Sequence, residues 1–342
     1  MSSKEPLISV IMSVYNREEY VAEAVESILG QTLADFEFII VDDGSTDRSV
    51  EIVQQYAGQD QRIRFILNKT NLGLPACRNI GIKNALGKYL ALMDSDDVSL
   101  PERFEGQTAY LDEHPQVWVL GTRVMKINAQ GQPLKEWKLP ENQYVIKWNS
   151  IFRNAGVVCN PSVMLRRELF TLVSEYDESA KSYEDLELWT RVFNFTEFWI
   201  RNLPEILLLY RVHDDSISGG NAYDLHSKPN EIRANLLSTF LQRKVDVIAI
   251  SAYESRQPLN MADVNNIIPL WFETYRKFSR DFHLSRKEKC MIYQEILKRT
   301  PAYTSLIPFS KNMWVISFLP LLQPTHVFWM TLARIYNLLS EI

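Results

Sequence analysis

Cysteines are few in this sequence, and none of them lies in a spacing that holds a metal. The chain has 342 residues and three cysteines, Cys77, Cys159 and Cys290, with no CxxC motif. An odd number of isolated cysteines indicates neither a disulfide framework nor a zinc site, and is typical of a reducing compartment. The first residues also lack the charged region, apolar stretch and cleavage site of a signal peptide. We therefore expect a cytoplasmic protein.

An excess of positive charge and long apolar runs are missing as well. The formal net charge is -5 and the isoelectric point is about 5.7, so no basic surface is predicted and we expect no nucleic-acid partner. The richest apolar stretch, residues 313–339, is interrupted by Pro320, Pro324 and Arg334. It therefore contains no run of about 20 apolar residues for a transmembrane helix.

Glycine-rich phosphate loops are also missing. There is no GxGxxG after the first predicted strand, and no GxxxxGK followed by Ser or Thr anywhere in the chain. The usual Rossmann and P-loop cradles for phosphates are thereby excluded. Any bound diphosphate must be held by a metal ion and side chains.

What is present is an acidic cluster directly after an apolar run. Residues 89–93 are apolar, and Asp94, Ser95, Asp96 and Asp97 follow. A short apolar run that ends in a turn predicts a buried parallel strand, and open α/β sheets bind ligands at the carboxyl ends of such strands. Two carboxylates about 4 Å apart repel by roughly 1 kcal/mol in water and about 4 kcal/mol at an effective dielectric near 20, which favours a bound cation such as Mg²⁺ or Mn²⁺. The alternative is an acidic turn that caps the following helix.

Strands and helices alternate through the N-terminal part of the chain. Segments with helical spacing separate four apolar runs, at 7–14, 36–41, 62–67 and 89–93. This alternation predicts an α/β fold with a parallel sheet, in which the loops after strands one, two and four share one edge. On that edge we expect Ser13, Tyr15, Asp43 and the acidic cluster, within reach of Arg78 on the helix before strand four.

Two further groups with possible chemistry lie later in the chain. Glu184 and Asp185 begin a helix with a predicted buried face, and compensation of the helix dipole is the alternative explanation for their position. His213 follows a predicted strand at 206–210, where a single histidine is more often a surface residue. Predicted strands at 117–121 and 123–128 lie between these groups and the acidic cluster.

Six ordered segments together resemble one known family. They are SVIMSVYN, VDDGSTD, TNLGLPACRN, MDSDD, YED and YRVHDDSIS, and they span about Pro6 to Ser218. The chain resembles the family 2 glycosyltransferases, which have the nucleotide-diphospho-sugar (GT-A) fold. The resemblance implies a mostly parallel sheet flanked by helices, with a helical C-terminal region.

The resemblance also implies a set of residues that bind the nucleotide. Ser13 and Tyr15 match positions that line a uracil pocket, and Asp43 matches the aspartate that hydrogen-bonds the base. Asn71 and Arg78 match residues around the nucleotide. The implied donor is therefore a nucleotide-sugar, most simply a UDP-sugar.

Metal binding and catalysis are assigned in the same way. Asp94-Ser95-Asp96 matches the Asp-x-Asp motif of the family, and the additional Asp97 leaves open whether Asp96 or Asp97 is the direct metal ligand. His213 matches a histidine near the metal or the diphosphate. Asp185 matches the general base.

The function implied by the resemblance is an inverting, metal-dependent transfer of a single sugar to an acceptor hydroxyl, with Mn²⁺ or Mg²⁺ as cofactor. The Gln-x-x-Arg-Trp signature of processive polymerases is absent. The implied acceptor is a saccharide or a lipid-linked molecule in cell-surface polysaccharide or glycolipid biosynthesis. A nucleotidyltransferase is one alternative, although VYNREEY lacks the glycine-rich basic loop expected of it. A non-catalytic sugar-nucleotide-binding module is the other.

The two ends of the chain are expected to form different domains. We predict a GT-A catalytic domain over residues 1–225 and a helical region over 226–342, with helices near 232–244, 261–278 and 285–298. In the last segment, Thr325 to Glu341, apolar residues surround a narrow polar stripe. Two predictions follow from it: packing on the catalytic domain or on a second subunit of a homo-oligomer, or peripheral contact with the cytoplasmic face of the inner membrane.

Overall fold

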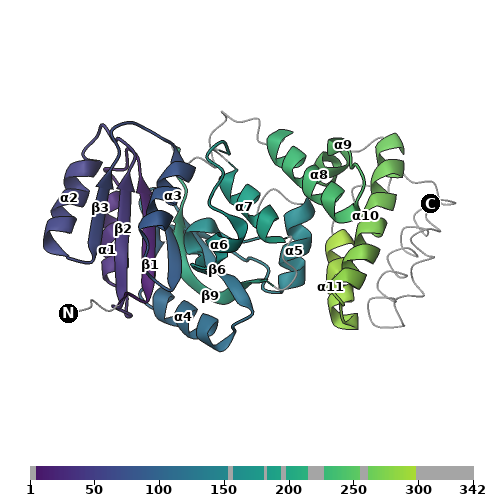
Figure 1. Cartoon of the computed structure of the whole chain (residues 1–342), viewed down its shortest axis with the longest axis horizontal. Helices are drawn as coiled ribbons and strands as arrows, with labels where there is room; N and C mark the ends of the chain where they lie inside the picture. The colour runs from purple at the N-terminus through teal and green to yellow at the C-terminus, as the bar shows by residue number, and fades with distance from the viewer. Residues whose placement is uncertain are drawn as a thin grey trace. The chain divides into compact units, whose positions relative to one another are not determined.

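The computed structural model describes residues 5–152, 157–180, 183–193, 198–214, 227–254 and 261–297 (Figure 1). The chain divides into two compact units, residues 1–245 and 246–342. Compactness alone does not define which residues catalysis needs, so the functional boundary near residue 225 stays a prediction. The segment Thr325 to Glu341 lies outside the described residues.

The first unit is built on a nine-stranded sheet with the order β3-β2-β1-β4-β8-β6-β9-β5, and β7 pairs with β6. The strands are β1 (Ile8–Val14), β2 (Phe36–Asp42), β3 (Ile63–Leu67), β4 (Tyr89–Asp94), β5 (Val98–Ser99), β6 (Val117–Ile127), β7 (Pro133–Trp137), β8 (Met164–Arg166) and β9 (Trp199–Arg211). Its helices are α1 (Val21–Leu29), α2 (Ser49–Gln59), α3 (Leu74–Asn84), α4 (Arg103–Glu113), α5 (Gln143–Phe152), the 3-10 turn η1 (Asn160–Ser162), α6 (Leu169–Val173), α7 (Glu184–Phe193) and α8 (Ser227–Leu241).

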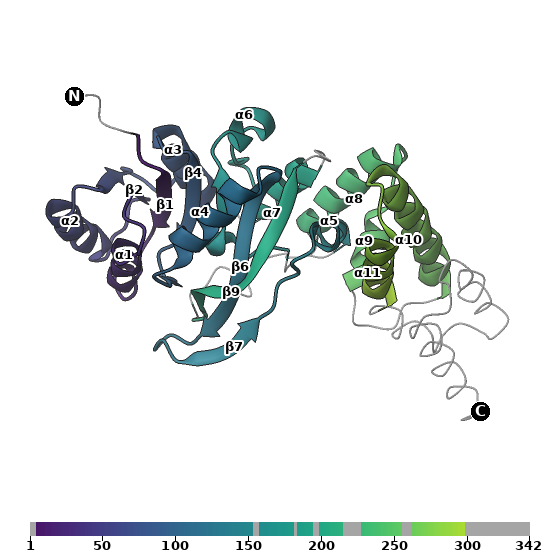
Figure 2. The same cartoon turned by 90° about the horizontal axis from the view of Figure 1, so that it is seen from below.

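Helices cover both faces of this sheet. One apolar cluster joins one face to α1, α2 and α4, and the other joins the opposite face to α3, α5, α6 and α7. Figure 2 shows α1 and α3 on opposite sides of the first strands. Because both faces are covered, β1 and β2 are buried along nearly their whole length, which explains their continuous apolar sequences. The α/β fold predicted from the sequence is confirmed.

The sheet changes character beyond β4. The pairs β1–β2, β2–β3 and β1–β4 are parallel as predicted, whereas β8 runs antiparallel to both β4 and β6. The two strands predicted at 117–121 and 123–128 form the single strand β6, because its pairing with β9 continues through irregularities on both sides of Arg123. β9 likewise begins before the predicted 206–210.

The second unit is helical in its described part. It contains α9 (Val247–Glu254), α10 (Met261–Asp281) and α11 (Arg286–Leu297). α10 and α11 correspond to predicted helices, whereas α9 was not predicted. α8 packs against α5 and α7 and therefore belongs to the first unit. Among the described helices, none combines the length and the apolar character needed to cross a membrane.

Candidate active site

The order of the strands places the predicted site residues at one point of the sheet. The chain runs outward from β1 through β2 to β3 and then returns to the other side of β1 as β4. Ligands of open α/β sheets bind where the strand order reverses in this way, outside the carboxyl ends of the strands. Ser13 at the end of β1 pairs with Val41 of β2 on one side and with Asp94 of β4 on the other. We call this region the donor edge.

Asp43 is held at the donor edge by fixed hydrogen-bond donors. Its Oδ1 accepts from Leu72 N at 2.8 Å and Asn68 Nδ2 at 3.0 Å, and its Oδ2 accepts from Gly73 N at 2.8 Å. Gly73 has a φ of 94°, a conformation that favours glycine. Burial opposes the charged form of Asp43, but these hydrogen bonds outweigh it and hold its pKa below the usual value. The carboxylate is therefore ionised at neutral pH and keeps acceptor capacity for a ligand.

The loops after β1 and β2 are tied together beside Asp43. Asn16, with a φ of 50°, accepts from Thr46 N at 2.8 Å and donates its backbone N–H to Ser45 Oγ at 2.9 Å. Arg17 N donates to Ser49 Oγ at 2.7 Å. Tyr15 is 44% exposed, so its ring is accessible to a ligand at this edge.

Each carboxylate of the acidic cluster has a different partner. Asp94 Oδ1 lies 3.2 Å from Arg78 Nη2. Asp96 Oδ2 lies 3.1 Å from His213 Nε2 and 3.3 Å from Arg17 Nε. The third carboxylate, that of Asp97, points into the protein, toward the backbone of Arg211.

Asp97 is almost completely buried, at 1% exposure. Its Oδ1 accepts from Arg211 N at 2.7 Å, and no described residue donates to its Oδ2. Burial and the neighbouring carboxylates of Asp96 and Asp94 raise the pKa of Asp97 well above its usual value. Burial also raises the pKa of Asp94, against the opposing effect of Arg78. Of the two candidates for the direct metal ligand, Asp97 is therefore buried, whereas Asp96 has an oxygen in contact with His213.

Arg78 connects the donor edge to the helix that carries the predicted base. Its Nη1 lies 2.5 Å from Glu184 Oε1 at the start of α7, while Nη2 faces Asp94. Burial opposes the charge of Arg78, but Glu184 and Asp94 raise its pKa. Burial, together with the negative charge of the nearby Asp185, raises the pKa of Glu184 to about 7 against the opposing effect of Arg78.

Asp185 follows Glu184 on α7 but is half-buried, and its Oδ1 accepts from Leu186 N at 2.6 Å. Its charge raises the pKa of both Asp94 and Glu184. The two carboxylates therefore divide into an inner one, which binds Arg78, and an outer one, which lies beside the donor edge. Arg78 binds Glu184 of this pair, whereas the hydrogen bond that the structure describes for the Asp185 carboxylate is the one from Leu186 N.

The structure brings most of the predicted residues together and adds three more. Asn71 is exposed and its side chain makes no hydrogen bond to the described residues. Arg17, Glu184 and Arg211 were not among the predicted ligands. Arg211 donates to Asp96 O at 2.7 Å and to Glu23 of α1 at 2.5 Å. Signals for these residues were present, since Glu184 and Arg211 lie inside the segments YED and YRVHDDSIS and Arg17 directly follows SVIMSVYN.

The chemistry of the donor atoms fits a hard divalent ion in part. Asp96 offers carboxylate oxygen and His213 offers imidazole nitrogen, which suit Mn²⁺ or Mg²⁺ when a substrate phosphate completes the coordination. In the described part of the chain, no group of three or more His, Cys, Asp or Glu side chains is arranged to hold an ion. A ligand set of protein and substrate atoms together is therefore the arrangement that these residues fit.

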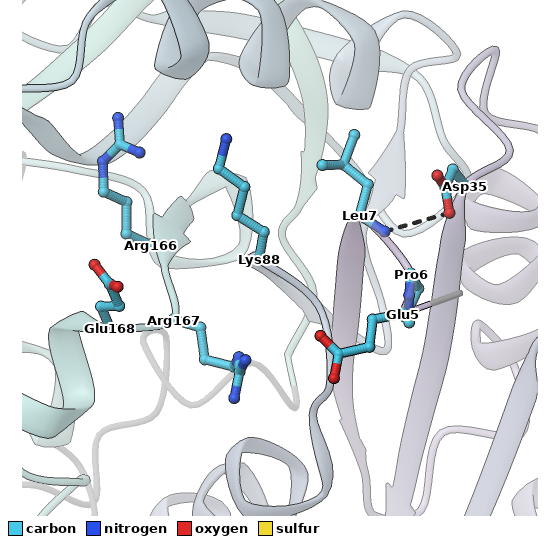
Figure 3. Close-up of a pocket in the computed structure, with 8 residues that line it drawn as sticks. All are labelled: Glu5, Pro6, Leu7, Asp35, Lys88, Arg166, Arg167 and Glu168. Carbon is cyan, nitrogen blue, oxygen red and sulfur yellow. Dashed lines mark hydrogen bonds between the residues drawn. The ribbon is translucent and has the colours of Figure 1, made fainter. Parts of the chain in front are cut away.

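A separate cavity of about 400 Å³ lies at the other end of the sheet. Figure 3 shows its lining, in which Leu7, Asp35 and Lys88 directly precede β1, β2 and β4. Leu7 N donates to Asp35 Oδ1 at 3.3 Å, and the nearby Arg167 Nε donates to Gly87 O at 2.7 Å. The cavity therefore lies at the amino ends of the parallel strands, opposite the donor edge.

Comparison with known proteins agrees with this geometry. Residues 9–172 match the model of a family described as glycosyl transferase family 2. An uncharacterized glycosyltransferase of Methanocaldococcus jannaschii is 37% identical over 211 residues, which cover 61% of this chain and 71% of that protein. The O-antigen biosynthesis glycosyltransferase WbnJ of Escherichia coli is 34% identical over 214 residues, covering 61% of this chain and 81% of WbnJ.

The fold is shared with a solved structure. The crystal structure of Staphylococcus aureus TarS 1-349 in complex with UDP-GlcNAc matches 86% of this chain and 89% of that chain, with a TM-score of 0.57 and 22% identity. This likeness confirms the GT-A fold, and the relatives above confirm the family. The chain belongs to glycosyltransferase family 2, and the protein is a glycosyltransferase.

Proposed function

We propose that this glycosyltransferase moves a single sugar from a UDP-sugar to an acceptor hydroxyl with inversion, using Asp185 as the base and a divalent ion at Asp96 and His213. The observation that carries the proposal is the double contact of Arg78, which binds Asp94 of β4 and Glu184 of α7. It fixes the start of α7 at the donor edge. Asp185 is the neighbouring carboxylate on that helix.

The contacts of Asp43 support recognition of a uracil base. Three hydrogen bonds occupy part of its carboxylate, and a base N–H is the kind of donor that the remaining acceptor capacity would take. Ser13 Oγ has no hydrogen-bond partner among the described residues, and Tyr15 offers an exposed ring next to it. TarS, which shares the fold, has been solved with UDP-GlcNAc.

Asp185 is suited to take a proton from an acceptor hydroxyl. The hydroxyl oxygen then attacks the anomeric carbon on the side opposite the departing diphosphate. A positioned carboxylate base contributes roughly 10²- to 10⁴-fold to such a step. When bound, Mn²⁺ or Mg²⁺ supplies positive charge for the departing diphosphate.

The biological setting that we propose is synthesis of a cell-surface polysaccharide or glycolipid, with a saccharide or lipid-linked acceptor. The name of WbnJ, an O-antigen biosynthesis enzyme, supports this setting. The match to a glycosyltransferase family favours this proposal over the two alternatives, a nucleotidyltransferase and a non-catalytic binding module.

The test is the variant Asp185→Asn. We expect it to bind UDP as the wild type does and to transfer sugar 10²- to 10⁴-fold more slowly, because it removes a base and keeps the binding surface. Glu187→Gln is the matched control, since Glu187 lies on the same helix and binds Arg191 at 2.7 Å. Calorimetry with UDP and a turnover assay with a panel of nucleotide sugars measure the two quantities. Transfer by Asp185→Asn at the wild-type rate would show that another group is the base.

A further inference from the structure

Arg17 occupies a position on Asp96 that the proposed function does not explain. Its Nε lies 3.3 Å from Asp96 Oδ2, the same oxygen that faces His213 Nε2 at 3.1 Å. Both side chains in the Arg17–Asp96 pair are only 18% exposed. A guanidinium is charged at all relevant pH values. The oxygen proposed to hold the divalent ion is therefore already in contact with a permanent cation.

The backbone of Arg17 is fixed, which limits what can move. Its N–H donates to Ser49 Oγ at 2.7 Å, and the residues on both sides, Asn16 and Glu18, donate their N–H groups to Ser45 Oγ at 2.9 Å and to Asp47 Oδ2 at 3.0 Å. Glu18 in turn accepts from Arg48 N at 3.0 Å. The Arg17 side chain can therefore leave Asp96 only by rotating about its own bonds, while its backbone stays in place.

The other two carboxylates of the cluster are bound differently. Asp94 is held by Arg78, which is buried and also bound to Glu184. Asp97 accepts a backbone N–H from Arg211 inside the protein. In each case the partner is held by further buried contacts. Asp96 is the one carboxylate of the three whose arginine partner lies on a loop, the one between β1 and α1.

We propose that Arg17 is a place-holding cation: it neutralises Asp96 in the ligand-free enzyme and is displaced from this carboxylate by the divalent ion that arrives with the donor. The inference rests on the proposed function, because it takes Asp96 as a metal ligand. Arg17 is then a positioning residue, which keeps the acidic cluster compact without metal and opposes binding of an ion that has no nucleotide. Its fixed backbone keeps the released guanidinium at the donor edge.

The test measures Mn²⁺ binding to the ligand-free full-length protein by electron paramagnetic resonance. Because a cation beside the ligand oxygen repels a divalent ion, Arg17→Gln should bind Mn²⁺ alone roughly tenfold more tightly than the wild type. A residue with a merely structural role would not give this result, since damage to a site does not raise its affinity. Addition of Mn²⁺ should also raise the melting temperature of Arg17→Gln by more than that of the wild type.

Two control variants separate charge at this position from charge elsewhere. Arg17→Lys keeps the cation and should bind Mn²⁺ within about twofold of the wild type. Arg48→Gln removes the same unit charge from the neighbouring loop, where Arg48 is 71% exposed and pairs with Glu51, and should also stay within about twofold because exposed pairs are screened. Equal or weaker Mn²⁺ binding by Arg17→Gln, or no binding by any of these proteins, would overturn the inference.

The variant Asp96→Ala distinguishes failure of this inference from failure of the proposed function. It should lose Mn²⁺ binding with and without Arg17. If it does so while Arg17→Gln binds Mn²⁺ as the wild type does, the place-holding role is wrong and the metal site stands. If Asp96→Ala binds Mn²⁺ as the wild type does, the metal site itself is wrong, and the assay of Asp185→Asn still tests the transfer reaction.

Discussion

Two acidic loops meet at the donor edge, and their carboxylates are stabilised in opposite ways. In the loop after β2, Asp43 accepts from two backbone N–H groups and an amide that follow β3, and its pKa is lowered. In the loop after β4, Asp94 and Asp97 are buried close to other carboxylates, and their pKa values are raised. Fixed dipoles keep a carboxylate permanently charged for hydrogen bonding. Crowded carboxylates instead call for a positive charge that can be exchanged.

The same difference appears in the residue composition of the two loops. VDDGSTD contains short hydroxyl residues and a glycine, which offer local hydrogen bonds: Asp42, for example, accepts from both the N–H and the hydroxyl of Ser45, at 2.8 and 2.7 Å. MDSDD offers few local donors, and its carboxylates depend on residues far along the chain. Asp42 is thus satisfied within its own loop, whereas Asp43 and the carboxylates after β4 depend on residues further along the chain.

Among variants that test this difference between the loops, Asp43→Asn should change the free energy of unfolding most. An amide has one acceptor oxygen and turns an NH₂ group toward a donor, so a partly buried N–H of Leu72 or Gly73 loses its partner. The free energy of unfolding should fall by about 2–3 kcal/mol, as measured by urea unfolding at pH 7. Asp60→Asn is the control, because Asp60 binds Arg62 in a partly exposed pair and its loss should cost at most about 1 kcal/mol. Equal stability of Asp43→Asn and the wild type would contradict this account.

An effect of similar size is expected in the pH dependence of stability. The pKa of Glu184 is raised from 4.5 to about 7 in the folded protein, first by burial. Because the folded state then binds more protons than the unfolded state between these values, the free energy of unfolding should rise as the pH falls from about 8 to 5, by up to roughly 3 kcal/mol. Asp43, whose pKa is lowered, acts in the opposite direction: its contribution is present at neutral pH and is lost only in acid, as the pH falls through its folded pKa.

The variant Glu184→Gln tests this difference, since Gln keeps an oxygen for Arg78 but cannot titrate. Urea unfolding at pH 5, 6, 7 and 8 should show a flatter profile for the variant than for the wild type. Identical profiles would mean that Glu184 is ionised throughout this range, with its charge fully balanced by Arg78.

The smallest effect is expected in Asp97→Asn. Its neutral side chain keeps an oxygen for the N–H of Arg211 and removes the acidic group whose pKa is raised by burial and by repulsion from Asp96 and Asp94. The free energy of unfolding in EDTA should stay within about 1 kcal/mol of the wild type, because the lost hydrogen-bond energy and the relieved repulsion are of similar size. A loss as large as that of Asp43→Asn would remove the distinction between the two loops.

The sequence alone was sufficient for the features that depend on local patterns. Apolar runs that end in polar turns identified β1, β2 and β4 and the carboxyl ends where Ser13, Asp43 and Asp94 lie. After the first strand, the helical spacing of Tyr20, Val21, Ala24, Val25 and Ile28 predicts one buried face, and all of these except the half-buried Tyr20 are buried. Such patterns are readable because strand and helix periods place side chains on fixed faces whatever the rest of the chain does.

Only the tertiary structure decided which residues complete the site. Arg78 binds Glu184 across 106 positions of sequence, and Arg211 binds Glu23 across 188. Arg103, at the start of α4, is fully buried and donates to the carbonyls of Leu92 and Val163 behind the acidic cluster. Burial in turn lowers its pKa to about 10. No periodicity encodes these contacts, because a charged side chain becomes an internal ligand only when distant elements pack around it and remove the water that would otherwise solvate it.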